Sequence, residues 1–137
     1  MMLIQTIHFP GNCDEAIAYY KETVGATVNV INYFSEAPSG TVVEGFSLPN
    51  HVMNSNLEIF GTPVSMTDGA ATPVDSENFT FTVFLNSAEE VTEVFNKLAD
   101  TGEIIEPLEP QFWVALTGFV KDRYGLQWNL CTSDALG

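Results

Sequence analysis

The sequence predicts an α+β fold in which two βαβββ modules form curved mixed sheets around a cleft. First, a strand-to-helix joint occurs twice: an apolar strand, a turn at Asn and a new helix follow one another at Asn12 and again at Asn86. Second, a glycine, Gly25 or Gly102, stands where each helix is expected to end, and glycine commonly follows helices. Third, segments of strand-like composition, rich in Val, Ile and aromatic residues, follow each helix.

The first module is expected to cover residues 1–68. Its helix follows Asn12, a favourable N-cap residue type. The apolar stripe of this helix is expected to contain Ala16, Ile17, Tyr20 and Val24. Strands are expected at residues 3–9, 26–34, 41–48, 52–59 and 64–67, of which 41–48 is irregular. Residues 69–77 are rich in Ala, Pro and Gly without periodicity, which is typical of a linker.

The second module, residues 78–137, repeats the order, so residues 1–137 are expected to form a single domain. Asn86 or Ser87 is expected to cap its helix, since Ser87 and Glu90 match a capping box. The buried face of this helix is expected to contain Val91, Val94, Phe95 and Leu98. Strands are expected at residues 79–85, 103–108, 112–120 and 126–131, with Gly125 at positive φ in the last turn.

Alternation along the strands separates a core face from a second, more polar face. Leu57 and Ile59 point to one side of their strand, and Asn54, Asn56 and Glu58 point to the other. When Asn12 is aligned with Asn86, the apolar faces of the two modules coincide. The opposite faces are expected to carry His8, Asn54, Asn56, Thr80, Thr82 and Asn129. Two such half-polar sheets enclose a cleft, which is where a ligand is expected.

Composition excludes several classes of function. The 137 residues include 18 acidic and 4 basic residues, for a formal net charge of −14. Phosphate backbones and anionic membrane surfaces repel such a chain, so neither nucleic acid nor a membrane is an expected partner. No apolar run reaches the length of a membrane span. The only cysteines, Cys13 and Cys131, make no disulfide framework. A cytoplasmic location is expected.

Short motifs in both modules resemble those of a known family. The segments that carry the resemblance are Phe9-Pro10-Gly11-Asn12, Glu15-Ala16, Tyr20-Lys21, Gly25, Leu57-Glu58-Ile59, Thr67-Asp68, Leu98-Ala99 with Gly102, and residues 122–128. In this order they are similar to the PhnB-like branch of the vicinal oxygen chelate (glyoxalase/bleomycin resistance/dioxygenase) superfamily, over nearly the whole chain. The resemblance implies the glyoxalase/bleomycin resistance fold and a homodimer.

Metal-dependent members of this superfamily hold a divalent ion with His, Glu or Gln on the cleft strands. The metal-binding Glu of such relatives falls on Asn129 here, a His found in many PhnB-like relatives falls on Asn54, and the His of the first strand falls near Ile4 or Gln5. These residues are poor ligands for transition metals, so the resemblance favours no metal cofactor. PhnB-like proteins often carry the label demethylubiquinone methyltransferase. Here no glycine-rich cofactor loop follows a strand.

Two histidines occur, and only His8 is expected in the cleft. His8 is the candidate catalytic residue, as a general base or a ligand, with a hydrogen-bonded cleft residue as the alternative. His51 precedes a strand and is expected in a surface loop. Cys13 lies at a helix N-terminus, a place that lowers a thiol pKa, but no partner for nucleophilic catalysis is evident.

The candidate ligand-binding residues are His8, Asn54, Asn56, Thr82, Trp113 and Asn129. The amides are expected either to hydrogen-bond a polar ligand or only to line a water-filled groove. Phe112 or Trp113 is a candidate wall for ligand stacking, with a core or dimer contact as the alternative. By alternation with Asn129, Trp128 is expected in the core.

The leading functional hypothesis is a PhnB-like protein that binds an unidentified small molecule without a tightly held metal. One alternative is a divalent-metal-dependent lyase or dioxygenase that uses His8. A third hypothesis is a non-catalytic dimeric module with a vestigial cleft.

Overall fold

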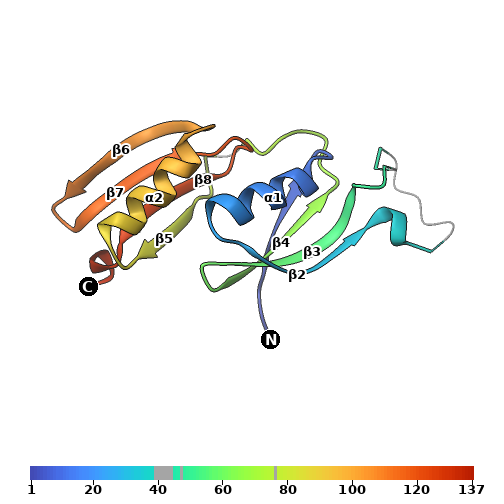
Figure 1. The fold of residues 1–137 in the computed structure, drawn as a ribbon, viewed down its shortest axis with the longest axis horizontal. Coiled ribbons are helices and arrows are strands. Elements are labelled where there is room, and N and C mark those ends of the chain that lie inside the picture. The colour runs from blue at the N-terminus through green and yellow to red at the C-terminus, as the bar shows by residue number, and fades with distance from the viewer. Residues whose placement is uncertain (39–44, 47, 76) are drawn as a thin grey trace. The chain divides into compact units, whose positions relative to one another are not determined.

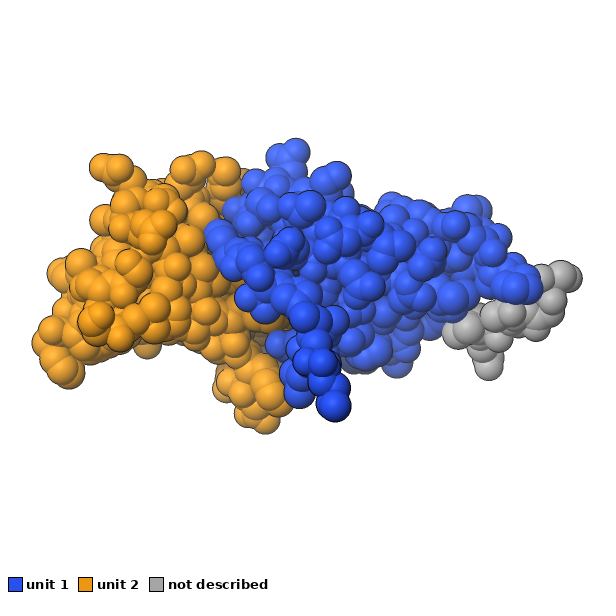
Figure 2. Space-filling model, turned by 90° about the horizontal axis from the view of Figure 1, so that it is seen from below, with its two compact units in different colours: residues 1–73 blue, residues 74–137 orange. Residues whose placement is uncertain are grey.

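The computed structural model describes residues 1–38, 45–46, 48–75 and 77–137. It divides into two compact units, residues 1–73 and 74–137, which Figure 2 colours separately. Most of the strand predicted at residues 41–48 lies outside the described residues. None of the described helices is long and apolar enough to cross a membrane.

Unit 1 contains a four-stranded mixed sheet and one helix (Figure 1). Its elements are β1 (Gln5–Phe9), α1 (Cys13–Thr23), β2 (Thr27–Tyr33), β3 (Val52–Ile59) and β4 (Thr62–Asp68), with a short 3-10 helix at Phe34–Glu36. The strand order is β1-β4-β3-β2, in which β1 and β4 are parallel and the other pairs antiparallel. The predicted βαβββ order is therefore confirmed in this unit.

Unit 2 repeats that topology. Its elements are β5 (Phe81–Leu85), α2 (Ala88–Ala99), β6 (Glu103–Gln111), β7 (Val114–Lys121) and β8 (Gln127–Thr132), followed by a 3-10 helix at Ser133–Leu136. The strand order β5-β8-β7-β6 matches that of unit 1 element by element. The predicted α+β fold with two βαβββ modules is thus confirmed, whereas the module limits 1–68 and 78–137 stay a prediction.

Each helix covers the apolar face of its own sheet. On α1, the predicted stripe of Ala16, Ile17, Tyr20 and Val24 is buried. On α2, Val91, Phe95 and Leu98 are buried, but Val94 is only half-buried. Gly118 of β7 lets α2 approach closely, because a Cβ there would lie 2.7 Å from the Phe95 ring. The opposite face of each sheet is not covered by the helix of its own unit, so its side chains can make other contacts.

The cap of α1 differs from the prediction. Asn12 occupies the N-cap position, but its side chain makes no capping hydrogen bond. The carboxylate of Asp68, at the end of β4, instead accepts the backbone N–H groups of Gly11 at 2.9 Å and Cys13 at 3.0 Å. Its other oxygen accepts the N–H of Val52 at 2.8 Å. Because Asp68 lies 55 residues beyond Cys13 in the chain, no local sequence pattern predicts this cap.

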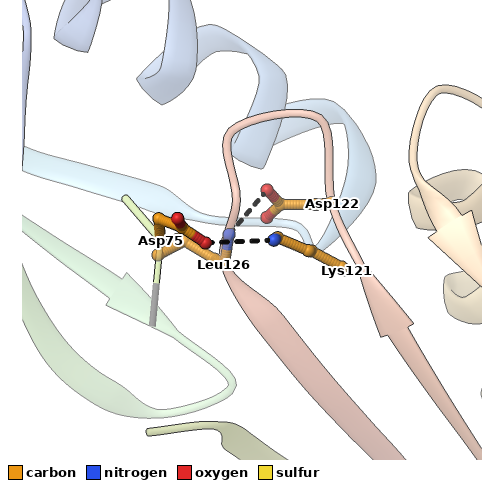
Figure 3. Close-up of polar contacts among 4 residues, drawn as sticks. All are labelled: Asp75, Lys121, Asp122 and Leu126. Atoms are coloured by element: carbon orange, nitrogen blue, oxygen red, sulfur yellow. Dashed lines mark hydrogen bonds and ion pairs between the residues drawn. The ribbon is translucent and has the colours of Figure 1, made fainter. Parts of the chain in front are cut away.

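A second buried carboxylate closes the turn between β7 and β8 (Figure 3). Asp122 accepts the backbone N–H groups of Tyr124 and Leu126 through one oxygen, and the indole N–H of Trp128 through the other at 2.9 Å. Gly125 takes the predicted positive φ, at 92°. Trp128 is buried, as alternation predicts.

Two local predictions are wrong. His51 is buried rather than exposed in a surface loop: its Nδ1 accepts the Leu48 N–H at 3.2 Å, and its ring packs edge-on against Phe46. The strand predicted at residues 103–108 continues to Gln111, so β7 begins at Val114 rather than at residue 112. Because β6 is an edge strand, Pro107 and Pro110 need not interrupt it.

Candidate polar faces of the two sheets

We use the term open face for the face of the unit 1 sheet that is turned away from α1. Strand register places two polar rows across it. In the first row, Thr6 pairs with Ser65, Ser65 with Asn56, and Asn56 with Val30. In the second row, His8 pairs with Thr67 and Asn54 pairs with Asn32. The rows lie side by side because their members are two residues apart on each strand.

His8 is held by its neighbour on β4. Its Nδ1 lies 3.0 Å from the hydroxyl oxygen of Thr67, and both side chains belong to the open face. The buried residues on either side, Ile7 and Phe9, fix the orientation of the strand, so the imidazole is exposed. The predicted orientation of His8 relative to the core is confirmed. The hydroxyl bond engages one ring nitrogen, and Nε2 is the atom through which the ring can act on a ligand.

The amides of the second row are also oriented by each other. The Asn32 side-chain amide donates to the Asn54 carbonyl oxygen at 2.9 Å, and both residues are exposed. Asn56 is exposed beside Ser65. The structure therefore gathers three of the predicted ligand-binding residues, His8, Asn54 and Asn56, on one face. It adds Thr67, Ser65 and Asn32, which sequence reasoning missed although alternation along β2 and β4 contains their signal.

The matching face of unit 2 is less open. Thr82 pairs with Asn129 across β5 and β8, as their common alternation predicts. The Asn129 carbonyl oxygen accepts the hydroxyl of Thr117 at 3.1 Å, and the Cys131 thiol lies 3.6 Å from it. Asn129 is half-buried and already bonded within its own sheet, whereas Thr82 is exposed.

Trp113 lies in the turn between β6 and β7, together with Phe112, and not within a strand. Trp113 is 46% exposed and Phe112 is fully exposed. Neither residue therefore belongs to the strand that was predicted to begin at residue 112. Their role as ligand contacts stays a prediction.

The Cys13 thiol is unsuited to nucleophilic chemistry. It is fully buried, and this burial raises its pKa far above the ordinary thiol value, with the nearby carboxylates of Asp68 and Asp14 adding to the shift. The direction is opposite to the lowering expected from the helix N-terminus, because desolvation and like charge outweigh the helix dipole here. Cys13 is a core residue.

The residues of the open face do not fit a transition-metal site. Within the described parts of the chain, no three His, Cys, Asp or Glu side chains lie close enough together to hold an ion. Asn54 on this face and Asn129 on the unit 2 sheet offer neutral amide oxygens, and each amide is bonded within its own sheet. Imidazole and carboxylate suit such ions much better than amides.

The paired βαβββ units, each with a helix on one sheet face and a polar face on the other, define a protein of the glyoxalase/bleomycin resistance fold, which solved glyoxalase-related structures share. The family model described as 3-demethylubiquinone-9 3-methyltransferase matches residues 2–131. The chain belongs to this family, the PhnB-like branch of the vicinal oxygen chelate superfamily.

Individual relatives agree with this assignment. Protein YjdN of Escherichia coli K12 is 32% identical over 140 residues, which cover 95% of this chain and 94% of the relative. The crystal structure of PA1353 from Pseudomonas aeruginosa has a TM-score of 0.80 at 25% identity, covering 96% of this chain and 97% of that one. A putative 3-demethylubiquinone-9 3-methyltransferase, PhnB protein, from Bacillus cereus has a TM-score of 0.79 at 21% identity, covering 96% and 99%.

Proposed function

We propose that this protein binds a small polar molecule on the open face of the unit 1 sheet, without a tightly held metal ion. The observation that carries the proposal is the pairing of His8 with Thr67 at 3.0 Å, next to the paired amides of Asn32 and Asn54. Side chains that are oriented by their neighbours lose less freedom when a ligand binds, which favours recognition.

The donor set supports binding without a metal. His8 is the one imidazole in the two rows, and its row neighbours are hydroxyls and amides. A tightly held divalent ion would need further imidazole or carboxylate ligands around His8. Glu58 is also exposed on β3, but it lies four residues beyond Asn54 on that strand and pairs with Thr27 and Pro63.

The alternative of a metal-dependent lyase or dioxygenase keeps one observation in its favour, the exposed His8 ring. The third reading, a vestigial face without a ligand, predicts no response to any small molecule. A homodimer, which the family resemblance implies, and a cytoplasmic location belong to the proposal as well. Light scattering after size exclusion tests the dimer, and a monomer peak would contradict it.

A thermal-shift screen of protein dialysed against EDTA tests the proposal. The panel contains polyols, aromatic antibiotics, thiol conjugates and quinones. A ligand present at about 100 times its Kd stabilises the folded state by roughly 2.7 kcal/mol, which is a shift of several degrees in Tm. The shift is expected to vanish in the double variant Asn54→Ala/Asn56→Ala and to persist in Asn96→Ala, an exposed site on α2. Silence across the panel favours the vestigial reading.

A further inference from the structure

The open face is mostly polar, with Val30 at the end of the first row and the carboxylate of Glu58 beside the rows. Its two rows carry three hydroxyls, three amides and one imidazole; these belong to Thr6, Ser65, Thr67, Asn32, Asn54, Asn56 and His8. Each hydroxyl and amide both donates and accepts hydrogen bonds, and a neutral imidazole donates through one ring nitrogen and accepts through the other. Hydroxyl groups also donate and accept hydrogen bonds, so this set of side chains complements a ligand that is rich in hydroxyls.

No Lys or Arg belongs to the strands that form this face. The four Lys and Arg residues of the chain are Lys21 on α1, Lys97 on α2, Lys121 at the end of β7, and Arg123 in the turn that follows. Lys97 forms an ion pair with Glu93 at 3.2 Å. Lys121 forms an ion pair with Asp75 at 3.6 Å (Figure 3). The strands of the open face therefore offer an anionic ligand none of the Lys and Arg side chains that bind carboxylates and phosphates strongly.

The surrounding field also opposes an anion. Glu58 adds a carboxylate on β3, and the chain as a whole carries a formal charge of −14. Net charge of this size lowers the local concentration of anions and slows their association. A ligand that bears a phosphate, phosphonate or carboxylate group would bind against this field.

Planar aromatic ligands find little to stack on in the rows. The apolar member is Val30, which is 40% exposed at the β2 end of the first row. Stacking on Phe, Tyr or Trp is a major source of affinity for planar ligands, and the only aromatic ring in the rows is the small imidazole of His8. Affinity must come from hydrogen bonds. Strands lie about 4.8 Å apart, so each row offers partners at a regular interval along a line.

We propose that the open face selects a hydroxyl-rich small molecule without an anionic group and discriminates against anionic analogues of the same skeleton. This inference rests on the proposed binding function and names its ligand class. The extended hydroxyl-rich chain lies across the strands, and its hydroxyls bond the amides of Asn54 and Asn56 and the Nε2 of His8.

Three probes with one carbon skeleton test the proposal: sorbitol, which is uncharged, glucamine, which is cationic, and sorbitol 6-phosphate, which is anionic. Each is titrated into nitrogen-15-labelled protein, and the side-chain amide signals of Asn54 and Asn56 are followed by NMR. Sorbitol is expected to shift both signals with a Kd at least about tenfold lower than that of sorbitol 6-phosphate, a difference of about 1.4 kcal/mol. Asn56→Ala is expected to weaken sorbitol binding, and Asn96→Ala serves as the matched control.

The outcomes separate the two proposals. Tighter binding of sorbitol 6-phosphate than of sorbitol, at the same amide signals, overturns the ligand class and leaves the binding function standing. Tighter binding of sorbitol 6-phosphate than of glucamine likewise overturns the ligand class. If none of the three probes nor any member of the thermal-shift panel moves these signals, the binding function itself fails.

Discussion

The Nδ1 atom of His8 lies 3.0 Å from the hydroxyl oxygen of Thr67, across the parallel pair β1 and β4. A hydroxyl can donate to a neutral imidazole nitrogen or accept from a protonated one, so this contact survives a change in the charge of the ring. Thr67 thereby acts as a positioning residue for the one titratable side chain in the two polar rows.

Thr67→Val is expected to free the His8 ring and to weaken ligand binding about fivefold, since a neutral side-chain hydrogen bond contributes roughly 1 kcal/mol. The nitrogen-15 shifts of the His8 ring at about pH 8, above the usual imidazole pKa, report its tautomer. They are expected to change in the variant. The ring shifts of His51, whose Nδ1 accepts the Leu48 N–H, are expected to stay constant. Unchanged His8 shifts would show that Thr67 does not position the ring.

Asp68→Asn is expected to destabilise unit 1 by about 2–4 kcal/mol. The carboxylate accepts three backbone N–H groups, from Gly11, Cys13 and Val52. In the variant, the amide NH₂ must face one of these donors and leaves it unsatisfied in the interior. Urea unfolding followed by circular dichroism measures the loss.

Asp75→Asn is the matched control for Asp68→Asn. The Asp75 side chain is 89% exposed in its ion pair with Lys121, so its replacement is expected to change stability by less than about 0.5 kcal/mol. Equal unfolding midpoints for the Asp68 and Asp75 variants would contradict the role assigned to Asp68.

Tyr33 is expected to ionise above the usual tyrosine pKa. Its hydroxyl donates to Asp14 at 2.6 Å, and this hydrogen bond, with smaller effects of burial and of the Asp14 charge, raises the pKa of Tyr33 to about 12. The folded state thus holds the phenol proton more tightly than the unfolded chain, where the pKa is about 10. The resulting stability is complete below about pH 10 and is lost as the pH rises through about 12.

Alkaline titration of phenolate absorbance measures this shift. Four tyrosines are present, and the difference between the wild-type and Tyr33→Phe curves isolates the ionisation of Tyr33, which is expected at about pH 12. Asp14→Asn is expected to lower the pKa of Tyr33 toward its usual value. A difference curve centred near the usual tyrosine pKa of about 10 would show that the bond to Asp14 is not formed.

Cys13 is expected to resist thiol reagents in the folded protein, because it is fully buried and its pKa is raised. In a Cys131→Ser variant at about pH 8, a disulfide reagent is expected to react with Cys13 much faster in urea than under native conditions. Equal rates under the two conditions would argue against the buried position.

Much of the fold could be predicted because it depends on local signals. The buried stripe of α1, the N-cap at Ser87 and the alternation of Asn54 and Asn56 against Leu57 all depend on nearby residues, and all are confirmed. The orientation of His8 followed from the same alternation. These are short-range patterns, which survive without knowledge of tertiary contacts.

Other features depend on contacts between distant residues. Asp68 caps α1 from the end of β4, and His51 is buried by Phe46 and the Leu48 turn, so neither role is visible in its own segment. The pKa of Cys13 likewise depends on burial and on Asp68, which outweigh the local helix effect. The hydrogen bond between His8 and Thr67 could not be predicted either, because it depends on the register between β1 and β4.

The central claim is that the open face around His8 works as a ligand surface without a tightly held metal. Calorimetric titration of EDTA-dialysed protein with Ni²⁺, Zn²⁺ and Mn²⁺ tests it most directly, with wild type and His8→Ala side by side. We predict that no ion binds at one equivalent more tightly than about 1 μM, a free energy of about −8 kcal/mol. One equivalent bound more tightly by the wild type, and lost in His8→Ala, would contradict the claim and favour a metal-dependent enzyme.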